Sequence, residues 1–444
     1  MRFTPHSDDD VRAMLAMIGA GSLDDLVAHV PAALRQRATL RLAPGIDEQA
    51  VRAELASLAA ANARPGALVF LGAGAYPHFI PAAVEQLAGR AEFATAYTPY
   101  QPEVSQGTLQ ATFEFQTAVA ALTGMEVANA GMYDGASAAA EAVLMTQRLR
   151  AGKPVVAVSR ALHPQYRAVI ATYLEGLPDA ELVEVPYRDD GTTELPADSL
   201  LKRASCLVVG YPNVFGAIED LERTATAVHG AGALVVSATT EALALPLLRT
   251  PGGAGVDIAV AEGQSLGLPL AYGGPGLGLF ASRQSFVRSL PGRLVGETVD
   301  ALGRRGYVLT LATREQHIRR ERATSNICTN HGLCALQATI YLSLLGRHGL
   351  RAVAERNLRG AHALAVRLKS IGRLRFAAPY FNEFVLEVRG ARRRWERALG
   401  DGVVAGLPLG DWYPELEECL LVCATELHDT AAHERLAAAL ARGG

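Results

Sequence analysis

Between residues 67 and 261 the sequence alternates short apolar runs with longer segments of helical character, and this alternation constrains the fold more than any other feature. The runs are apolar throughout, as expected of strands buried on both faces, and the helices between them favour parallel pairing. The sequence therefore predicts an α/β fold whose parallel sheet is covered by helices. The expected strands are residues 67–71, 155–159, 181–185, 206–210, 233–237 and 257–261.

Helix boundary signals agree with this interpretation. In residues 108–123, Phe115 and Val119 recur at helical spacing, and Gly124 is a typical residue for the end of a helix. Asp134 stands where it can cap the next helix through its side-chain oxygen. The segments between the expected strands therefore carry their own start and stop signals.

The chain of 444 residues is too long for one compact core. We expect a helical N-terminal segment at residues 1–65 and a large α/β domain at residues 66–310. A smaller C-terminal domain at residues 311–444 would contain isolated strands at 381–388 and 419–424.

Composition excludes several classes of protein. The net charge of −3 gives no electrostatic footprint for nucleic acid or an anionic membrane. No basic, apolar leader or membrane-spanning run is present, so we expect a cytoplasmic protein. There is no HExxH or paired CxxC pattern, and no metal site is predicted. We expect reduced thiols at all five cysteines, which are Cys206, Cys328, Cys334, Cys419 and Cys423.

Residues 97–107 read YTPYQPEVSQG and fit neither the helix nor the strand repeat. Pro99 and Pro102 each remove a backbone donor, which predicts a rigid loop. An ordinary surface turn is the plain alternative. Loops held by a scaffold often carry function. The candidate functional side chains of this loop are Tyr97, Tyr100, Gln101, Glu103, Ser105 and Gln106.

Residues 314–326 form a second candidate segment, REQHIRRERATSN, in which only Ile318 is a large apolar residue before the run ATSN. A solvated helix with ion pairs at helical spacing is one interpretation. The other is an interface or anion site, since arginine binds carboxylate or phosphate through paired hydrogen bonds. The candidates of this segment are Arg314, His317, Arg319, Arg320, Ser325 and Asn326.

Six motifs, found in order along most of the chain, resemble the P-protein family of the glycine cleavage system. The resemblance is to the α (first) subunits of its two-chain form, glycine dehydrogenase (decarboxylating). The motifs lie at residues 96–107, 129–142, 211–220, 263–280, 291–306 and 313–336.

The resemblance implies the fold of fold-type I enzymes dependent on pyridoxal phosphate (PLP), which bind the cofactor as a Schiff base to a lysine. Aligned on the family motif, that lysine position is Gln264, whose amide cannot form an imine. Ser237 or Ala238 stands where the partner carboxylate of the pyridine nitrogen is expected. The lysines of this chain all lie elsewhere, at Lys153, Lys202 and Lys369.

The resemblance therefore implies a subunit that completes the active site of a PLP-bearing β subunit in an α2β2 enzyme. Glycine would be decarboxylated, and its aminomethyl group passed to the lipoyl group of H-protein. Two alternatives remain open: a noncatalytic scaffold, and an independent PLP aminotransferase or lyase, which the lysine positions oppose. The side chains expected to face the active site are Tyr97, Tyr100, Gln101 and Glu103, with Ser105 to Gly107 holding the loop.

Overall fold

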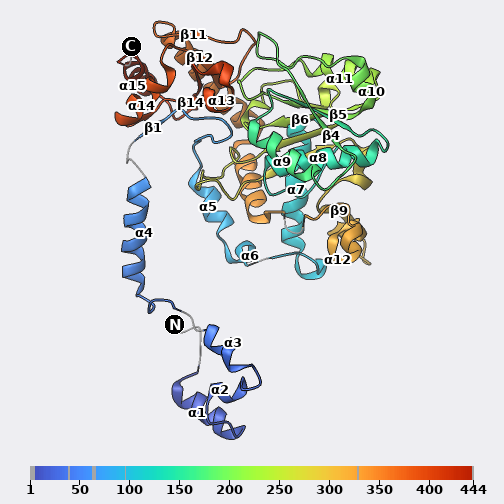
Figure 1. Ribbon diagram of the computed structural model, residues 1–444. Coiled ribbons are helices and arrows are strands. Elements are labelled where there is room, and N and C mark those ends of the chain that lie inside the picture. The colour runs from blue at the N-terminus through green and yellow to red at the C-terminus, as the bar shows by residue number, and fades with distance from the viewer. Residues whose placement is uncertain (1–5, 39–40, 63–66, 96, 328–329, 443–444) are drawn as a thin grey trace. The chain divides into compact units, whose positions relative to one another are not determined.

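The computed structural model describes every residue except 1–5, 39–40, 63–66, 96, 328–329 and 443–444 (Figure 1). It separates into two compact units, residues 1–65 and residues 66–444. The boundary predicted near residue 310 lies inside the second unit and stays a prediction. The helices of the first unit are α1 (Asp8–Met17), α2 (Leu23–Leu26), α3 (Ala32–Arg37) and α4 (Glu48–Asn62).

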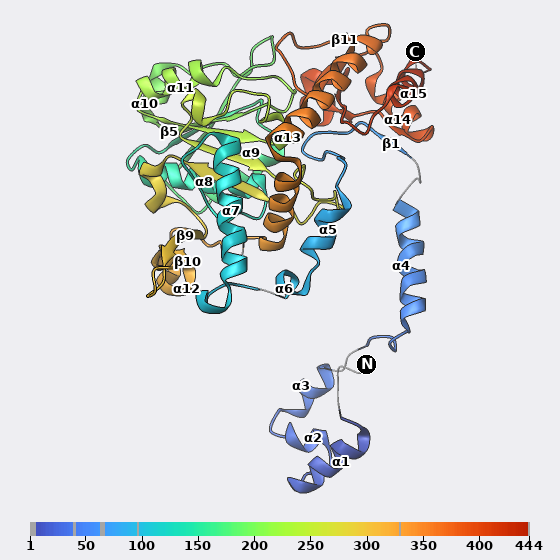
Figure 2. The same ribbon diagram turned by 180° about the vertical axis from the view of Figure 1, so that it is seen from behind.

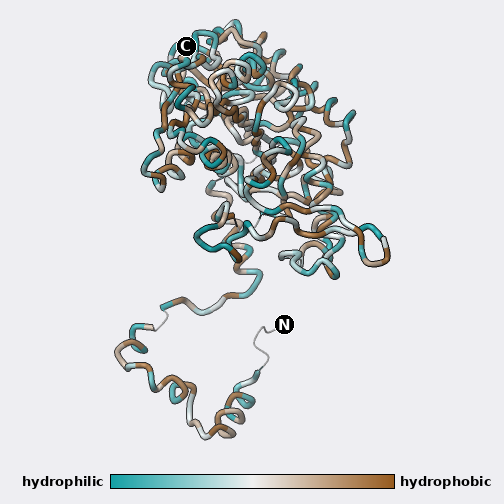
Figure 3. The backbone as a smooth tube through the Cα atoms, turned by 90° about the vertical axis from the view of Figure 1, so that its right-hand side faces the viewer, coloured by the Kyte–Doolittle hydropathy of each residue, from teal (hydrophilic) through white to brown (hydrophobic). Residues whose placement is uncertain are grey.

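The first unit has almost no core of its own. Among its described residues only Leu15 is buried, while Leu55 and Leu58 of α4 are each 59% exposed. Figure 3 shows apolar stretches along these helices.

The second unit is built on a seven-stranded sheet with the order β2-β8-β7-β6-β5-β3-β4. Pairing is parallel from β4 to β7, whereas β8 runs antiparallel to both β7 and β2. The α/β prediction is confirmed, with a mixed sheet in place of a purely parallel one. The strands are β2 (Val127–Ala128), β3 (Val155–Ser159), β4 (Glu181–Val185), β5 (Ala204–Gly210), β6 (Leu234–Thr239), β7 (Ile258–Glu262) and β8 (Gly278–Ser282).

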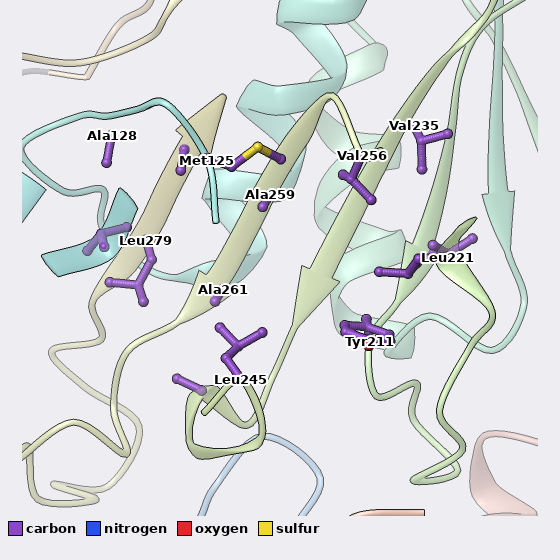
Figure 4. Close-up of a cluster of buried hydrophobic side chains, with 14 of the residues drawn as sticks. Met125, Ala128, Tyr211, Leu221, Val235, Leu245, Val256, Ala259, Ala261 and Leu279 are labelled. Atoms are coloured by element: carbon purple, nitrogen blue, oxygen red, sulfur yellow. The ribbon is translucent and has the colours of Figure 1, made fainter. Parts of the chain in front are cut away.

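Helices cover both faces of this sheet, as its apolar strands require. Side chains of α8 (Gly135–Leu149) and α9 (Pro164–Leu174) pack on the face turned to the viewer in Figure 1. Those of α7 (Gln106–Thr123), α11 (Leu221–Gly230) and the start of α13 (Gly332–Leu368) pack on the other face, seen in Figure 2. Figure 4 shows part of this second cluster.

A smaller four-stranded sheet follows, with the order β11-β12-β15-β14. One run predicted as a strand of the large sheet is placed differently. Residues 67–71 contain β1 (Leu68–Val69), which pairs with β13 (Val403–Val404) instead. The elements of this part are β11 (Arg373–Leu374), β12 (Glu383–Glu387), α14 (Ala391–Gly400), β14 (Leu407–Pro408), β15 (Cys419–Cys423) and α15 (Thr430–Ala441).

Cys206, Cys334, Cys419 and Cys423 are buried free thiols, while Cys328 lies outside the described residues. None of the helices among the described residues combines the length and the apolar character that crossing a membrane requires.

Candidate active site

The predicted loop at residues 97–107 is held in place by a buried arginine, Arg293. Residues 97–101 lead through the short helix η1 (Pro102–Val104) into α7, and Arg293 immediately precedes β9 (Leu294–Val299). The Arg293 guanidinium donates to the Tyr100 hydroxyl at 3.1 Å and to Thr98 Oγ1 at 3.5 Å. Its side chain is only 6% exposed, so the charge needs a close partner.

That partner comes from the second predicted segment. Glu315 Oε2 lies 3.4 Å from Arg293 Nε, and the Glu315 side chain is 10% exposed. The same oxygen is 3.6 Å from His317 Nδ1. The His317 ring meets the Tyr100 ring edge-on, with centroids 5.5 Å apart. The two predicted segments therefore meet, and we call this group the Arg293 cluster: Thr98, Tyr100, Arg293, Glu315 and His317.

Gln106 fixes the other end of the loop. Its Nε2 donates to the carbonyl oxygens of Tyr307 and Pro102, both at 2.8 Å, and its Oε1 accepts from the Tyr307 N–H at 2.9 Å. Tyr307 belongs to β10 (Arg305–Thr310), the hairpin partner of β9. Since Arg293 leads into β9, both ends of the loop are attached to one hairpin, and Figure 2 shows that hairpin beside the start of α7.

A cavity of ≈ 370 Å³ opens next to the cluster, lined by Tyr97, Phe115, Arg293, His331 and Cys334 among others. The outer side chains of the loop face away from the core. Tyr97 is 83% exposed and Tyr100 is 52% exposed. Gln101 and Glu103 are exposed as well, whereas Ser105 is half-buried at the start of α7.

The basic segment is less uniform than its composition indicates. Arg314 donates to the carbonyl oxygens of Leu290 and Gly292, and burial lowers the pKa of Arg314. Arg319 and Arg320 are exposed.

Farther along the same segment, Ser325 donates to the buried Glu141 carboxylate at 2.8 Å. Asn326 is exposed. The segment is thus attached through Arg314 and Glu315 at its start and through Ser325 near its end, with exposed arginines between them.

Gln264 lies apart from this cluster, just after β7. Its amide nitrogen donates to the Leu268 carbonyl at 2.8 Å, and its amide oxygen accepts from the Tyr76 N–H at 3.3 Å. Ser237, on β6, is buried and contributes no carboxylate. The lysines are found elsewhere: Lys153 before β3, Lys202 on α10 (Asp198–Arg203) and Lys369 at the end of α13. These residues do not fit a PLP bound covalently to this chain.

Charged side chains fill the region around Gln264. Tyr76 donates to Glu383 at 2.8 Å, and burial raises the pKa of Glu383 to about 7. His78 lies between Glu241 and Glu426, at 2.9 Å and 2.8 Å. Although burial opposes a charged ring, the two carboxylates raise the pKa of His78 to about 10. Hydrogen bonds and ion pairs between side chains of this chain therefore fill the region around Gln264.

Sequence reasoning missed Arg293, Glu315 and Thr98 as site residues. All three lie within or beside the candidate motifs. The only sequence signal for Arg293 is its place between a Pro-Gly pair and an apolar run. That pattern alone indicates an ordinary surface arginine.

Comparison with known structures defines the class first. The fold is that of fold-type I PLP-dependent enzymes, illustrated by glutamate decarboxylase of Lactobacillus brevis, with a TM-score of 0.66 at 14% identity over 93% of this chain and 96% of that one. A crystal structure of glycine decarboxylase (P-protein) of the glycine cleavage system, in inhibitor-bound form, matches with a TM-score of 0.93 at 45% identity over 100% of both chains.

The sequence comparisons then give the particular family. The model of the glycine cleavage system P-protein family matches residues 1–439. The chain is 52% identical to the probable glycine dehydrogenase (decarboxylating) subunit 1 of Anaeromyxobacter dehalogenans, over 96% of this chain and 97% of that protein. It is 50% identical to the protein of that name from Phenylobacterium zucineum, over 100% of both. The chain belongs to the glycine cleavage system P-protein family.

Proposed function

We propose that this chain is the subunit of glycine dehydrogenase (decarboxylating) that completes the active site of a PLP-bearing partner. The observation that carries the proposal is the exposed loop, held by the buried Arg293 at the mouth of a cavity in a chain with Gln264 at the lysine position. PLP, carried by the partner, supplies the electron sink for decarboxylation. The residues of this chain orient the substrate and exclude water.

The proposed assembly is an α2β2 heterotetramer in the cytoplasm that passes the aminomethyl group to the lipoyl group of H-protein. The "subunit 1" names of the relatives support a second subunit. The exposed Tyr97 and Val104 also support a partner surface over the loop. Co-expression with the β subunit should shift the chain to a heterotetramer in size exclusion, and a monodisperse monomer in its presence would contradict the assembly.

Two loop variants test the catalytic role in the co-expressed complex. Tyr100→Phe and Glu103→Gln should each slow the exchange of labelled bicarbonate into glycine by roughly a hundredfold to a thousandfold, the usual effect of losing a placed polar group. Gln110→Ala is the matched control, because Gln110 is exposed on α7 and its side-chain amide donates to its helix neighbour Glu114. Normal exchange by both variants, in intact complexes, would favour the scaffold alternative.

A further inference from the structure

The carboxylate of Glu262 occupies the N-terminus of α8. Its Oε2 accepts from the N–H of Gly135, the first residue of α8, at 2.9 Å. Its Oε1 accepts from the N–H groups of Leu277 at 2.9 Å and Gln264 at 3.1 Å. Both oxygens are therefore engaged by backbone donors, which favour the charged carboxylate. Burial nevertheless raises the pKa of Glu262 to about 7, so the group is an anion above that pH.

A helix N-terminus with free N–H groups is a natural site for phosphate, because the donors and the helix dipole both favour negative charge. Here Glu262 already takes that place. Gln264, at the lysine position, bonds the same carboxylate. A phosphate-bearing cofactor attached at position 264 would thus bring its phosphate close to the donors that Glu262 now occupies.

The backbone around the Glu262 carboxylate is closely packed. A Cβ atom at Gly135 would lie 2.1 Å from the Tyr166 hydroxyl, and one at Gly276 would lie 3.2 Å from Glu262 Oε2. Asp134, the capping residue of α8, adds a further negative charge beside this site. Glu262 itself is 9% exposed.

We infer that Glu262 is a built-in substitute for the phosphate of a cofactor, closing a latent phosphate subsite at the N-terminus of α8. The chain therefore excludes phosphate-bearing ligands here by occupying their donors, in addition to lacking the lysine. The subsite consists of groups of this chain, namely the Glu262 carboxylate and the N–H groups of Gly135, Leu277 and Gln264. Its behaviour can therefore be tested independently of the partner subunit and of the glycine reaction.

Removing the side chain should reopen the subsite. In Glu262→Ala the three N–H groups lose their acceptor, so the thermal midpoint should fall. Inorganic phosphate at about pH 8 should then raise the midpoint saturably by several degrees relative to chloride at the same ionic strength. Phosphate stabilises many proteins without binding, so the parent chain is measured alongside.

Glu383→Ala is the matched control, because Glu383 is also buried but accepts from Tyr76 and Ala73 rather than from a helix N-terminus. Equal phosphate effects in all three proteins would overturn the inference. Rescue of Glu262→Ala by acetate but not by phosphate would also overturn it, since the hole would then fit only a carboxylate.

If Glu262→Ala does not accumulate in folded form, its refolding yield from denaturant provides the measurement. Recovery in phosphate but not in chloride supports the subsite. Failure in both buffers, with Glu383→Ala recovering normally in each, counts against it.

Discussion

Arg293 and Tyr100 are joined in two ways. The guanidinium donates to the tyrosine hydroxyl at 3.1 Å, and its carbon lies 5.4 Å from the centre of the tyrosine ring. The buried Arg293 guanidinium thus fixes both the position and the ring orientation of the half-exposed Tyr100 side chain. The position of the exposed loop consequently depends on Arg293, which lies buried under the loop.

Replacing Arg293 with lysine should misplace the loop without abolishing assembly. Lysine keeps the charge but cannot bond Glu315 and reach both Thr98 and Tyr100 through a planar fork. Because displacement of a positioning group by about 1 Å can cost roughly a hundredfold in rate, we expect a loss of that order in bicarbonate exchange. The control is Arg304→Lys, at an exposed ion pair beside β10. Full activity of Arg293→Lys would show that the loop needs no fork.

Breaking the Arg293–Glu315 pair should strongly lower the free energy of unfolding. Glu315→Gln leaves a nearly buried guanidinium without its counter-charge, and we expect a loss of about 3 kcal/mol in the free energy of unfolding. Asp300→Asn breaks the exposed pair with Arg304 and should cost less than about 1 kcal/mol. Chemical denaturation of both variants measures the difference, and equal losses would refute the burial argument.

Borohydride reduction tests the cofactor assignment. The purified chain, incubated with PLP and reduced, should yield no stoichiometric label on Lys153, Lys202 or Lys369 when its peptides are analysed by mass spectrometry. The co-expressed complex serves as the positive control, with the label on the partner. A specific label on a lysine of this chain would contradict the proposed division of labour.

Glu383 should give the stability a distinct pH dependence. Burial raises the pKa of Glu383 from 4.5 to about 7, so the folded chain holds this proton more tightly than the unfolded chain. Its contribution to stability is complete below pH 4.5 and is lost as the pH rises through 7. Relative to Glu383→Gln, the parent should therefore lose about 3 kcal/mol between pH 4.5 and pH 7.

Denaturant titrations at several pH values measure that difference. Glu434→Gln, on the exposed side of α15, is the control and should follow the parent. Parallel curves for the parent and Glu383→Gln would show that the carboxyl has no raised pKa in the folded chain.

Local structure was predictable where one residue decides it. Asp134 caps α8 through the Ser137 N–H, and Gly124 ends α7 with a φ of 68°, as the sequence predicts. Pairing partners were not predictable in this way. The run at residues 67–71 has the composition of a buried strand, but composition does not reveal that β1 pairs with β13.

The candidate site shows the same limit. The prolines of the loop and the charge of residues 314–326 marked both segments in the sequence. What joins them is Arg293, whose ion-pair partner is 22 residues away and whose hydroxyl partner is 193 away. Such a contact exists only after the hairpin and α7 have packed, so no spacing in the sequence could indicate it.

The hydrogen bonds of Gln106 also bear on aggregation. Strand β10 is the edge of a two-stranded hairpin, and edge strands invite pairing with other chains. Gln106 satisfies both the N–H and the carbonyl of Tyr307 on that open edge, as a neighbouring strand would. The Gln106 amide thereby blocks the middle of the β10 edge from pairing with a strand of another chain. The residue that anchors the loop also protects the hairpin from aggregation.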